Sequence, residues 1–344
     1  MENLKDDRSP EDLHSVSGTM YTRSSGGPIP AQYRDPAVEY AALKEGAAIV
    51  DRSYRTVLRL AGKDPVGMLD AVLTNEVPKE MNLGAYAMLL NPKGRIQTDL
   101  RVLKTNGDVL IDTEPEGTGA AREILGRYAP FSRVKLEDLS ADGAWGILGL
   151  YGPHAGELLN GLRLAEHESS EIEVGGPSLL AAGVAVPVPG FDLLGTADDL
   201  RAAWEHLIRA GAVPSGLDAY ESARVEAGIP RFGSDITPEN FPAEAGILER
   251  AVSFKKGCYP GQETVARMHY RGHPNHTLHR LLVVKGPPPT PNTPIVQNEK
   301  QVGRITSTAP LPVNCRTFAL GYISRKANSD APLRAGDATV HLVS

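Results

Sequence analysis

The chain has 344 residues, of which 41% are hydrophobic and 23% are charged, and its formal net charge at pH 7 is −6. These values are typical of a globular protein of two or three domains, and the acidic balance disfavours a general nucleic-acid binder. No apolar run approaches the roughly 20 residues that span a bilayer, and two cysteines are too few for a disulfide framework. We therefore expect a cytoplasmic protein with reduced thiols and no membrane association.

The first part of the chain is expected to be irregular and then to form short helices. Residues 1–27 are polar, hold no apolar signal-peptide core and end in Ser-Ser-Gly-Gly, so we predict a poorly packed leader with order from about Ala31. Asp35-Pro36 and Asp64-Pro65 each predict a helix start, with aspartate as the N-cap and proline as the first helical residue. A strand is predicted between them at 56–60.

A β-hairpin is predicted, in which the strands Ala85–Leu90 and Arg95–Leu103 flank the turn sequence Asn91-Pro92-Lys93-Gly94. The second strand alternates, because Ile96 and every second residue after it are apolar or small. Asp99 lies on the opposite, polar face, which is solvated or faces a cavity.

Helices and strands continue to alternate irregularly up to about residue 275. The predicted elements are a helix at 116–129, strands at 133–139 and 145–150, a helix from Thr196 to Gly211 that begins with a Thr196/Asp199 capping box, and a helix at 217–227. The last helix carries Glu221 and Arg224 at the spacing of a local ion pair. Because strict βαβ alternation and a GxGxxG motif are both missing, the sequence predicts an α+β fold rather than a Rossmann domain.

The sequence changes character after Asn275. Four short strands separated by glycine and proline are predicted there, at 278–284, 302–307, 318–323 and 338–343. This pattern is typical of a small all-β module. We therefore divide the chain into the leader at 1–27, a main region at 28–275 and a β-module at 276–344.

The segment with the most potentially reactive or charged residues is Lys255–Glu263, with the sequence K-K-G-C-Y-P-G-Q-E. Glycines on both sides of Cys258 predict a tight loop that exposes the thiol, and the two lysines would favour its reactive thiolate form. A free cysteine can equally be buried and inert, so both interpretations stay open at this point. Cys315 has no such neighbours and is expected to be a structural thiol.

The stretch from Lys255 to Arg280 carries five Lys or Arg residues and one Glu. It is either a solvated face or a site for an anion such as a polyglutamate tail. The same stretch holds four histidines, His269, His273, His276 and His279. They could bind zinc or iron together with Cys258, or they could be ordinary surface groups. Motifs of P-loop enzymes, zincins and α/β-hydrolases do not occur in the sequence.

Two motifs resemble a known family. The segment 221–236, E-S-A-R-V-E-A-G-I-P-R-F-G-S-D-I, and the segment 256–263, K-G-C-Y-P-G-Q-E, look like those of the YgfZ-type folate-binding proteins. These belong to the superfamily of the glycine-cleavage T-protein, the aminomethyltransferase. Weaker similarity runs through Asp51-Arg52-Ser53, Leu73-Thr74-Asn75 and 86–99, so the resemblance covers most of residues 31–344.

The resemblance implies two interleaved α+β subdomains around a central folate cavity, followed by a C-terminal β-barrel. It implies tetrahydrofolate or a one-carbon derivative as the ligand, and iron–sulfur client or assembly proteins as partners. By motif position it assigns catalytic roles to Asp99 and Cys258, and folate binding to Tyr86, Asp99, Arg224, Lys256, Gln262 and Glu263.

The chain departs from the T-protein pattern at two places. Thr98 stands where the first of two adjacent aspartates is expected, and Val186–Phe191 replaces the stretch whose glutamate holds the pterin. A pterin ring needs an acceptor for its N–H edge, so this change bears directly on folate recognition.

Three hypotheses follow from the sequence. The first is a folate-binding accessory factor in iron–sulfur cluster assembly or repair that uses Cys258. The second is a folate-dependent aminomethyltransferase or related one-carbon transferase that uses Asp99. The third is a metal-binding or scaffold protein that needs no folate.

Overall fold

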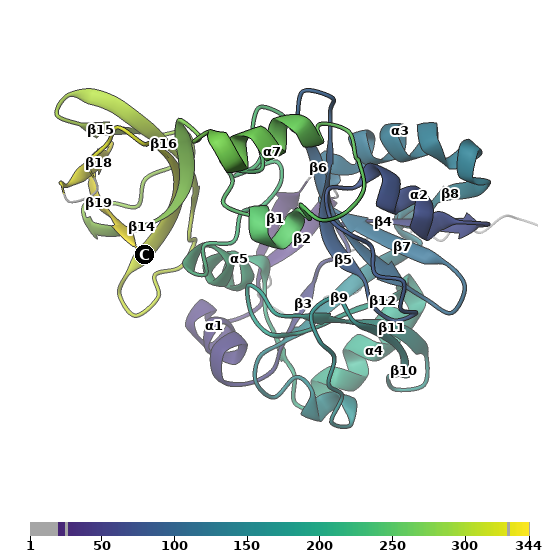
Figure 1. Ribbon diagram of the computed structural model, residues 1–344. Coiled ribbons are helices and arrows are strands. Elements are labelled where there is room, and N and C mark those ends of the chain that lie inside the picture. The colour runs from purple at the N-terminus through teal and green to yellow at the C-terminus, as the bar shows by residue number, and fades with distance from the viewer. Residues whose placement is uncertain (1–19, 25–26, 329–330, 344) are drawn as a thin grey trace, which may run out of the picture.

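A computed structural model describes residues 20–24, 27–328 and 331–343. Two β-sheets with their covering helices lie next to each other, and a closed β-barrel forms the C-terminal end (Figure 1). The predicted α+β class with a C-terminal barrel is therefore confirmed. Within the described ranges, no helix has the length and apolar character that a bilayer crossing requires.

The first sheet has five antiparallel strands in the order β5-β6-β7-β4-β8. Their bounds are β4 Thr56–Gly62, β5 Ala85–Leu90, β6 Ile96–Lys104, β7 Val109–Thr113 and β8 Val134–Asp138. Helices α2 (Pro65–Val72) and α3 (Thr118–Tyr128) cover the sheet, and their side chains Leu69 and Leu125 share one apolar core with Leu58 of β4. This burial is the main stabilising contribution in the first subdomain.

The second sheet has six strands in the order β10-β11-β12-β9-β3-β13. Their bounds are β3 Ala48–Asp51, β9 Trp145–Tyr151, β10 Ser169–Glu173, β11 Ser178–Val184, β12 Gly190–Thr196 and β13 Val213–Pro214. Helix α4 (Ala197–Arg209) packs Trp204 and Leu207 into the core of this sheet. Because β3 precedes the whole first sheet and β9 follows it, the chain builds two interleaved subdomains, as predicted.

Side chains cap the helix starts that the sequence predicts. Asp35 accepts the N–H of Ala37 at the start of α1 (Pro36–Glu45), and Asp64 accepts the N–H of Gly67 in α2. Thr196 accepts the N–H of Asp199 at the start of α4. All three predicted starts are confirmed, because each depends only on residues within one helical turn.

The C-terminal barrel closes in the order β14-β17-β16-β15-β18-β19. Its strands are β14 His276–Lys285, β15 Pro294–Gln297, β16 Lys300–Thr308, β17 Thr317–Ser324, β18 Leu333–Ala335 and β19 Ala338–Val343. Helix α5 (Leu217–Glu226) lies between the sheets and the barrel (Figure 1), and Val225 packs on Ala309 and Leu320. Closure leaves no open sheet edge in this module.

Helices α6 (Leu248–Ala251) and α7 (Gln262–Arg271) follow α5 in the chain and precede the barrel. The sequence did not predict α7, which begins at the end of the Cys258 loop and stops before Gly272. Short 3-10 turns complete the fold at Pro115–Gly117, Ala129–Ser132, Ala141–Gly143 and Glu157–Leu159.

Structured backbone begins earlier than the predicted Ala31. Strand β1 (Met20–Ser24) pairs antiparallel with β2 (Gly27–Gln32). The difference arises because Ile29 and Ala31 are buried, with Ile29 in the core shared by α1 and α5. The rest of the predicted leader, at 1–19 and 25–26, lies outside the described residues.

Candidate functional site

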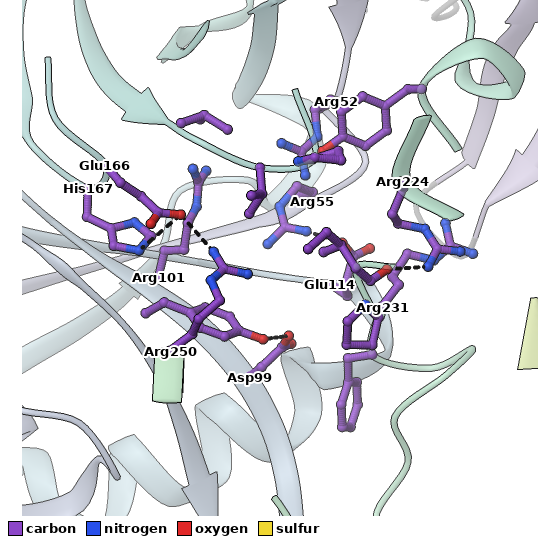
Figure 2. Close-up of a pocket in the computed structure, with 18 of the residues that line it drawn as sticks. Arg52, Arg55, Asp99, Arg101, Glu114, Glu166, His167, Arg224, Arg231 and Arg250 are labelled. Atoms are coloured by element: carbon purple, nitrogen blue, oxygen red, sulfur yellow. Dashed lines mark hydrogen bonds and ion pairs between the residues drawn. The ribbon is translucent and has the colours of Figure 1, made fainter. Parts of the chain in front are cut away.

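A pocket opens where the two sheets meet, and it receives residues from both sheets, from α5 and from α6 (Figure 2). Its empty volume is about 730 Å³, a figure that includes open solvent at the mouth. Arginines outnumber carboxylates in the lining, so the walls favour an anionic ligand. The charged residues of the lining are Arg52, Arg55, Arg101, Arg224, Arg231, Arg250, Asp99, Glu114, Glu166 and Glu221.

Asp99 faces this pocket from β6, as the strand alternation predicts. Its Oδ2 atom accepts a hydrogen bond of 2.6 Å from the hydroxyl of Tyr86 on the neighbouring strand β5. Thr98 points to the other face of the sheet, where its buried hydroxyl lies 2.9 Å from that of Thr113. Thr98 therefore supports the sheet and contributes nothing to the pocket.

The environment of Asp99 suits a proton acceptor. Burial raises the pKa of Asp99 from 3.8 to about 6, although the Tyr86 hydroxyl and the charge of Arg55 both act to lower it. A carboxyl group with such a pKa can exchange a proton near neutral pH, as a general base requires. Because the pKa is higher in the folded protein than in the unfolded chain, ionisation of Asp99 at pH 7 opposes folding.

Replacing Tyr86 by Phe is expected to raise the pKa of Asp99 above 6, because the variant loses the hydrogen bond that stabilises the carboxylate. Titration of aspartate carboxyl carbons by NMR measures this value in both proteins. Tyr128→Phe, which changes an exposed tyrosine of α3, serves as the control. An unchanged or lower pKa of Asp99 in Tyr86→Phe would contradict this account of the pair.

Two buried aspartates behind the pocket join the sheets. Asp192 on β12 lies 3.1 Å from Arg52 and 2.5 Å from Arg101, and Asp112 on β7 lies 2.6 Å from Arg101 and 3.0 Å from Arg55. Arg101 belongs to the first sheet and Asp192 to the second, so this chain of ion pairs crosses between them. It also fixes three pocket arginines in position.

Arg224 lines the pocket, but neighbouring groups already engage its guanidinium. It lies 2.8 Å from Glu221 and 2.7 Å from Asp235, and it donates to the Ser307 hydroxyl at 3.0 Å. The local ion pair with Glu221 is confirmed. Because Ser307 belongs to β16, Arg224 also joins α5 to the barrel, and its pairing with folate stays a prediction.

Three other predicted folate-binding residues do not contribute to the pocket lining. The buried ammonium of Lys256 donates to the carbonyls of Leu73 and Asn75 at 2.9 and 3.0 Å. Gln262 and Glu263 form the first turn of α7. In this structure Lys256 therefore connects its loop to the end of α2, and its charge is engaged away from Cys258.

Cys258 is exposed in its loop and also lies outside the pocket lining. The loop nevertheless contacts the hairpin that carries Asp99. Gly261 has φ +82°, and a Cβ atom there would lie 2.6 Å from the carbonyl oxygen of Asn91 and 2.8 Å from Cα of Gly94. Glycine at this position thus permits direct backbone packing of the loop on the β5–β6 turn.

The expectation for Cys315 is wrong, because this thiol is also exposed. Asn314 and Cys315 have φ values of 50° and 61° in a tight turn that Val313 and Arg316 close. This turn presents the Cys315 side chain to solvent. Exposure therefore does not distinguish the two thiols.

The four histidines of the basic stretch do not gather around Cys258. In the described part of the chain, no group of three or more His, Cys, Asp or Glu residues is arranged to hold a metal ion. His269 stacks on Phe254 with ring centroids 4.2 Å apart, and His279 Nε2 lies 2.7 Å from the Thr277 hydroxyl. These histidines contribute to local packing, and the stretch 255–280 adds no residue to the pocket lining.

Several pocket residues were missed at the level of sequence. Arg101 shares the polar face of β6 with Asp99, and Arg52 lies in a segment of weaker resemblance, so both carried a usable signal. Glu166, His167 and Arg250 come from a turn and a four-residue helix. No periodicity marks such positions.

Comparison with known proteins gives a consistent result. Residues 11–256 match the family model described as GCVT N-terminal domain. Aminomethyltransferases of Symbiobacterium thermophilum and Thermus thermophilus are 28% and 27% identical to the chain, covering 91% and 92% of it and 88% and 90% of their own lengths. A putative chloroplastic transferase of Arabidopsis thaliana is 27% identical over 84% of the chain and 68% of its own length.

The fold comparison agrees with the sequence comparison. The crystal structure of glycine cleavage system aminomethyltransferase T from Bartonella henselae aligns with a TM-score of 0.84. The alignment covers 97% of this chain and 95% of that one, at 21% sequence identity. This likeness shows a shared architecture, barrel included.

Proposed function

Because this chain belongs to the GCVT N-terminal domain family, we propose that it binds tetrahydrofolate in the arginine-lined pocket and transfers a one-carbon unit there, as an aminomethyltransferase or a related enzyme. The observation that carries this proposal is the pair of Asp99 and Tyr86, 2.6 Å apart, in a pocket with more arginines than carboxylates.

The groups of the pocket fit a reduced folate. Arg231, with its side chain 27% exposed, can meet a carboxylate of a glutamate tail. Phe232 and the tyrosines of the lining offer ring surfaces to a flat heterocycle. Arg52 Nε and His167 Nδ1 are buried without a hydrogen-bond partner among the described residues, which is typical of positions that a ligand completes.

Tetrahydrofolate, when bound, would supply the amine nitrogen that accepts the one-carbon unit. The protein supplies the proton acceptor, because Asp99 is mostly ionised above pH 6 and can hold a proton at its carboxylate. Tyr86 orients that carboxylate, and the ion pairs behind the pocket hold the arginines that would bind anionic groups.

An activity assay tests this proposal. The full chain is incubated with tetrahydrofolate and an aminomethyl donor, and one-carbon derivatives of the folate are measured by mass spectrometry. We expect product that depends on the protein and increases as the pH rises through about 6, since Asp99 must be ionised. Absence of a one-carbon product with the aminomethyl donor would contradict the proposal.

A second candidate, the accessory role in iron–sulfur cluster assembly, is favoured by the exposed thiol of Cys258. Under this candidate, Cys258→Ser is expected to lower the activity of iron–sulfur enzymes in cells while folate binding is unchanged. Cys315→Ser, which removes the other exposed thiol, is the matched control. Full iron–sulfur enzyme activity in Cys258→Ser cells would exclude the thiol-based mechanism.

A further inference from the structure

One end of the pocket is formed by a turn that both sheets hold in place. The N–H of His167 donates to the carbonyl of Gly183 in β11 at 3.0 Å, and its carbonyl accepts the N–H of Gly84, next to β5, at 2.9 Å. His167 has φ 65°, a left-handed conformation that residues with side chains seldom adopt. The bonds on both sides keep the turn in this conformation, which fixes Glu166 and His167 on the pocket wall.

Neighbouring described residues contact only one oxygen of the Glu166 carboxylate, Oε1. Arg250 Nη2 lies 2.7 Å from Oε1, and His167 Nε2 lies 3.8 Å from the same atom (Figure 2). No hydrogen bond from a described residue reaches Oε2, and the side chain is 34% exposed in the lining. An oriented carboxylate with a free oxygen can accept N–H donors from a ligand.

The other carboxylates of the pocket are less accessible to a ligand. Glu221 Oε1 accepts no hydrogen bond from a described residue, but the side chain is only 13% exposed and lies between two arginines, at 2.8 and 3.5 Å. Glu114 is buried and paired with an arginine, and Asp99 already accepts the tyrosine hydroxyl. Glu166 is therefore the carboxylate best able to bind donors on a neutral ring.

The wall next to this turn has no acidic side chain of its own. Val186 and Pro187 line the pocket directly after β11, in the stretch where the T-protein resemblance expects the pterin-holding glutamate. We propose that Glu166 takes this role, accepting the ring N–H groups of the pterin, while Arg250 positions its carboxylate. The inference rests on the proposed folate binding and names the residue that selects the heterocycle.

The protonation state of His167 agrees with this arrangement. Burial and the charge of Arg101 lower the pKa of His167 to about 4, so the imidazole is neutral at pH 7. A neutral ring does not neutralise the charge of Glu166, which leaves the carboxylate available to the ligand.

The proposal is tested by comparing the affinities of two proteins for two ligands. Wild type and Glu166→Gln are titrated calorimetrically with tetrahydrofolate and with its analogue in which a methyl group replaces the 2-amino group. We expect Glu166→Gln to bind tetrahydrofolate about tenfold to a hundredfold more weakly, because hydrogen bonds to a charged acceptor are lost. Wild type should discriminate against the analogue by a similar factor, and the variant should discriminate much less.

Three further variants extend the test. Glu157→Gln changes an exposed glutamate that is not part of the pocket lining and should leave both affinities unchanged. Arg250→Met removes the group that positions Glu166 and should weaken tetrahydrofolate binding, whereas Arg250→Lys should restore part of it.

The outcomes separate this inference from the proposed function. If wild type binds tetrahydrofolate and Glu166→Gln keeps both its affinity and its preference over the analogue, the role of Glu166 is wrong and the proposed function stands. If wild type does not bind tetrahydrofolate, both are wrong.

Discussion

Replacing Asp99 by Asn is expected to lower the rate of one-carbon transfer by about 10²–10⁴-fold, the range for loss of a general base. The folded protein should not become less stable at pH 7. Burial raises the pKa of Asp99 to about 6, so the ionised carboxylate opposes folding there, whereas asparagine carries no charge and still offers an acceptor to Tyr86.

Turnover and urea unfolding, measured on the same preparations, check this prediction. Asp142→Asn is the matched control, because Asp142 is exposed and its φ of 57° suits asparagine. Turnover within a few-fold of wild type in Asp99→Asn would remove Asp99 from the chemistry. A large loss of stability would mean that its charge supports the fold, against the direction of its pKa.

Replacing Asp192 by Asn is expected to lower the free energy of unfolding by about 3–5 kcal/mol, the cost of breaking a buried ion pair from one side. Asp192 is fully buried and pairs with Arg52 at 3.1 Å and Arg101 at 2.5 Å. Asparagine cannot balance two guanidinium charges, and the contact between the sheets depends on them.

Asp108→Asn is the control for this variant, because its partner Arg59 lies at 2.7 Å in a partly exposed pair. Such pairs contribute under about 1 kcal/mol, so this variant should stay close to wild type in urea unfolding. A change below 1 kcal/mol in Asp192→Asn as well would show that the ion pairs between the sheets do not support the fold.

The pH dependence of stability has a definite sign at this site. Burial alone would raise the pKa of Asp192, but the charges of Arg101 and Arg52 outweigh it and hold the pKa below its ordinary value. The contribution of Asp192 is therefore present above the unfolded pKa, near 4, and is lost as the pH falls through the folded pKa. Wild type should lose more stability than Asp192→Asn on acidification below about pH 4.

Elements defined by local rules could be predicted from the sequence. The aspartate–proline pairs at the starts of α1 and α2 act within one helical turn, and the alternation of β6 sufficed to place Asp99 on the pocket side. Strands β11 and β12 were not predicted, because their central residues are buried on both faces and show no alternation.

Long-range contacts explain why part of the candidate site could not be predicted. Lys256 was expected next to the Cys258 thiol, but its ammonium is bound by carbonyls 183 and 181 positions earlier in the chain. Arg224 is engaged by Ser307, 83 positions later. Charge counted along a local stretch does not reveal such partners.

The central claim is that a reduced folate binds in the arginine-lined pocket, and calorimetric titration of the full chain with tetrahydrofolate at pH 7 tests it most directly. The account predicts a single site with a stoichiometry near one, and weaker binding in Glu166→Gln than in Glu157→Gln. Titration curves without binding heat up to millimolar tetrahydrofolate, supported by an independent equilibrium dialysis, would contradict it.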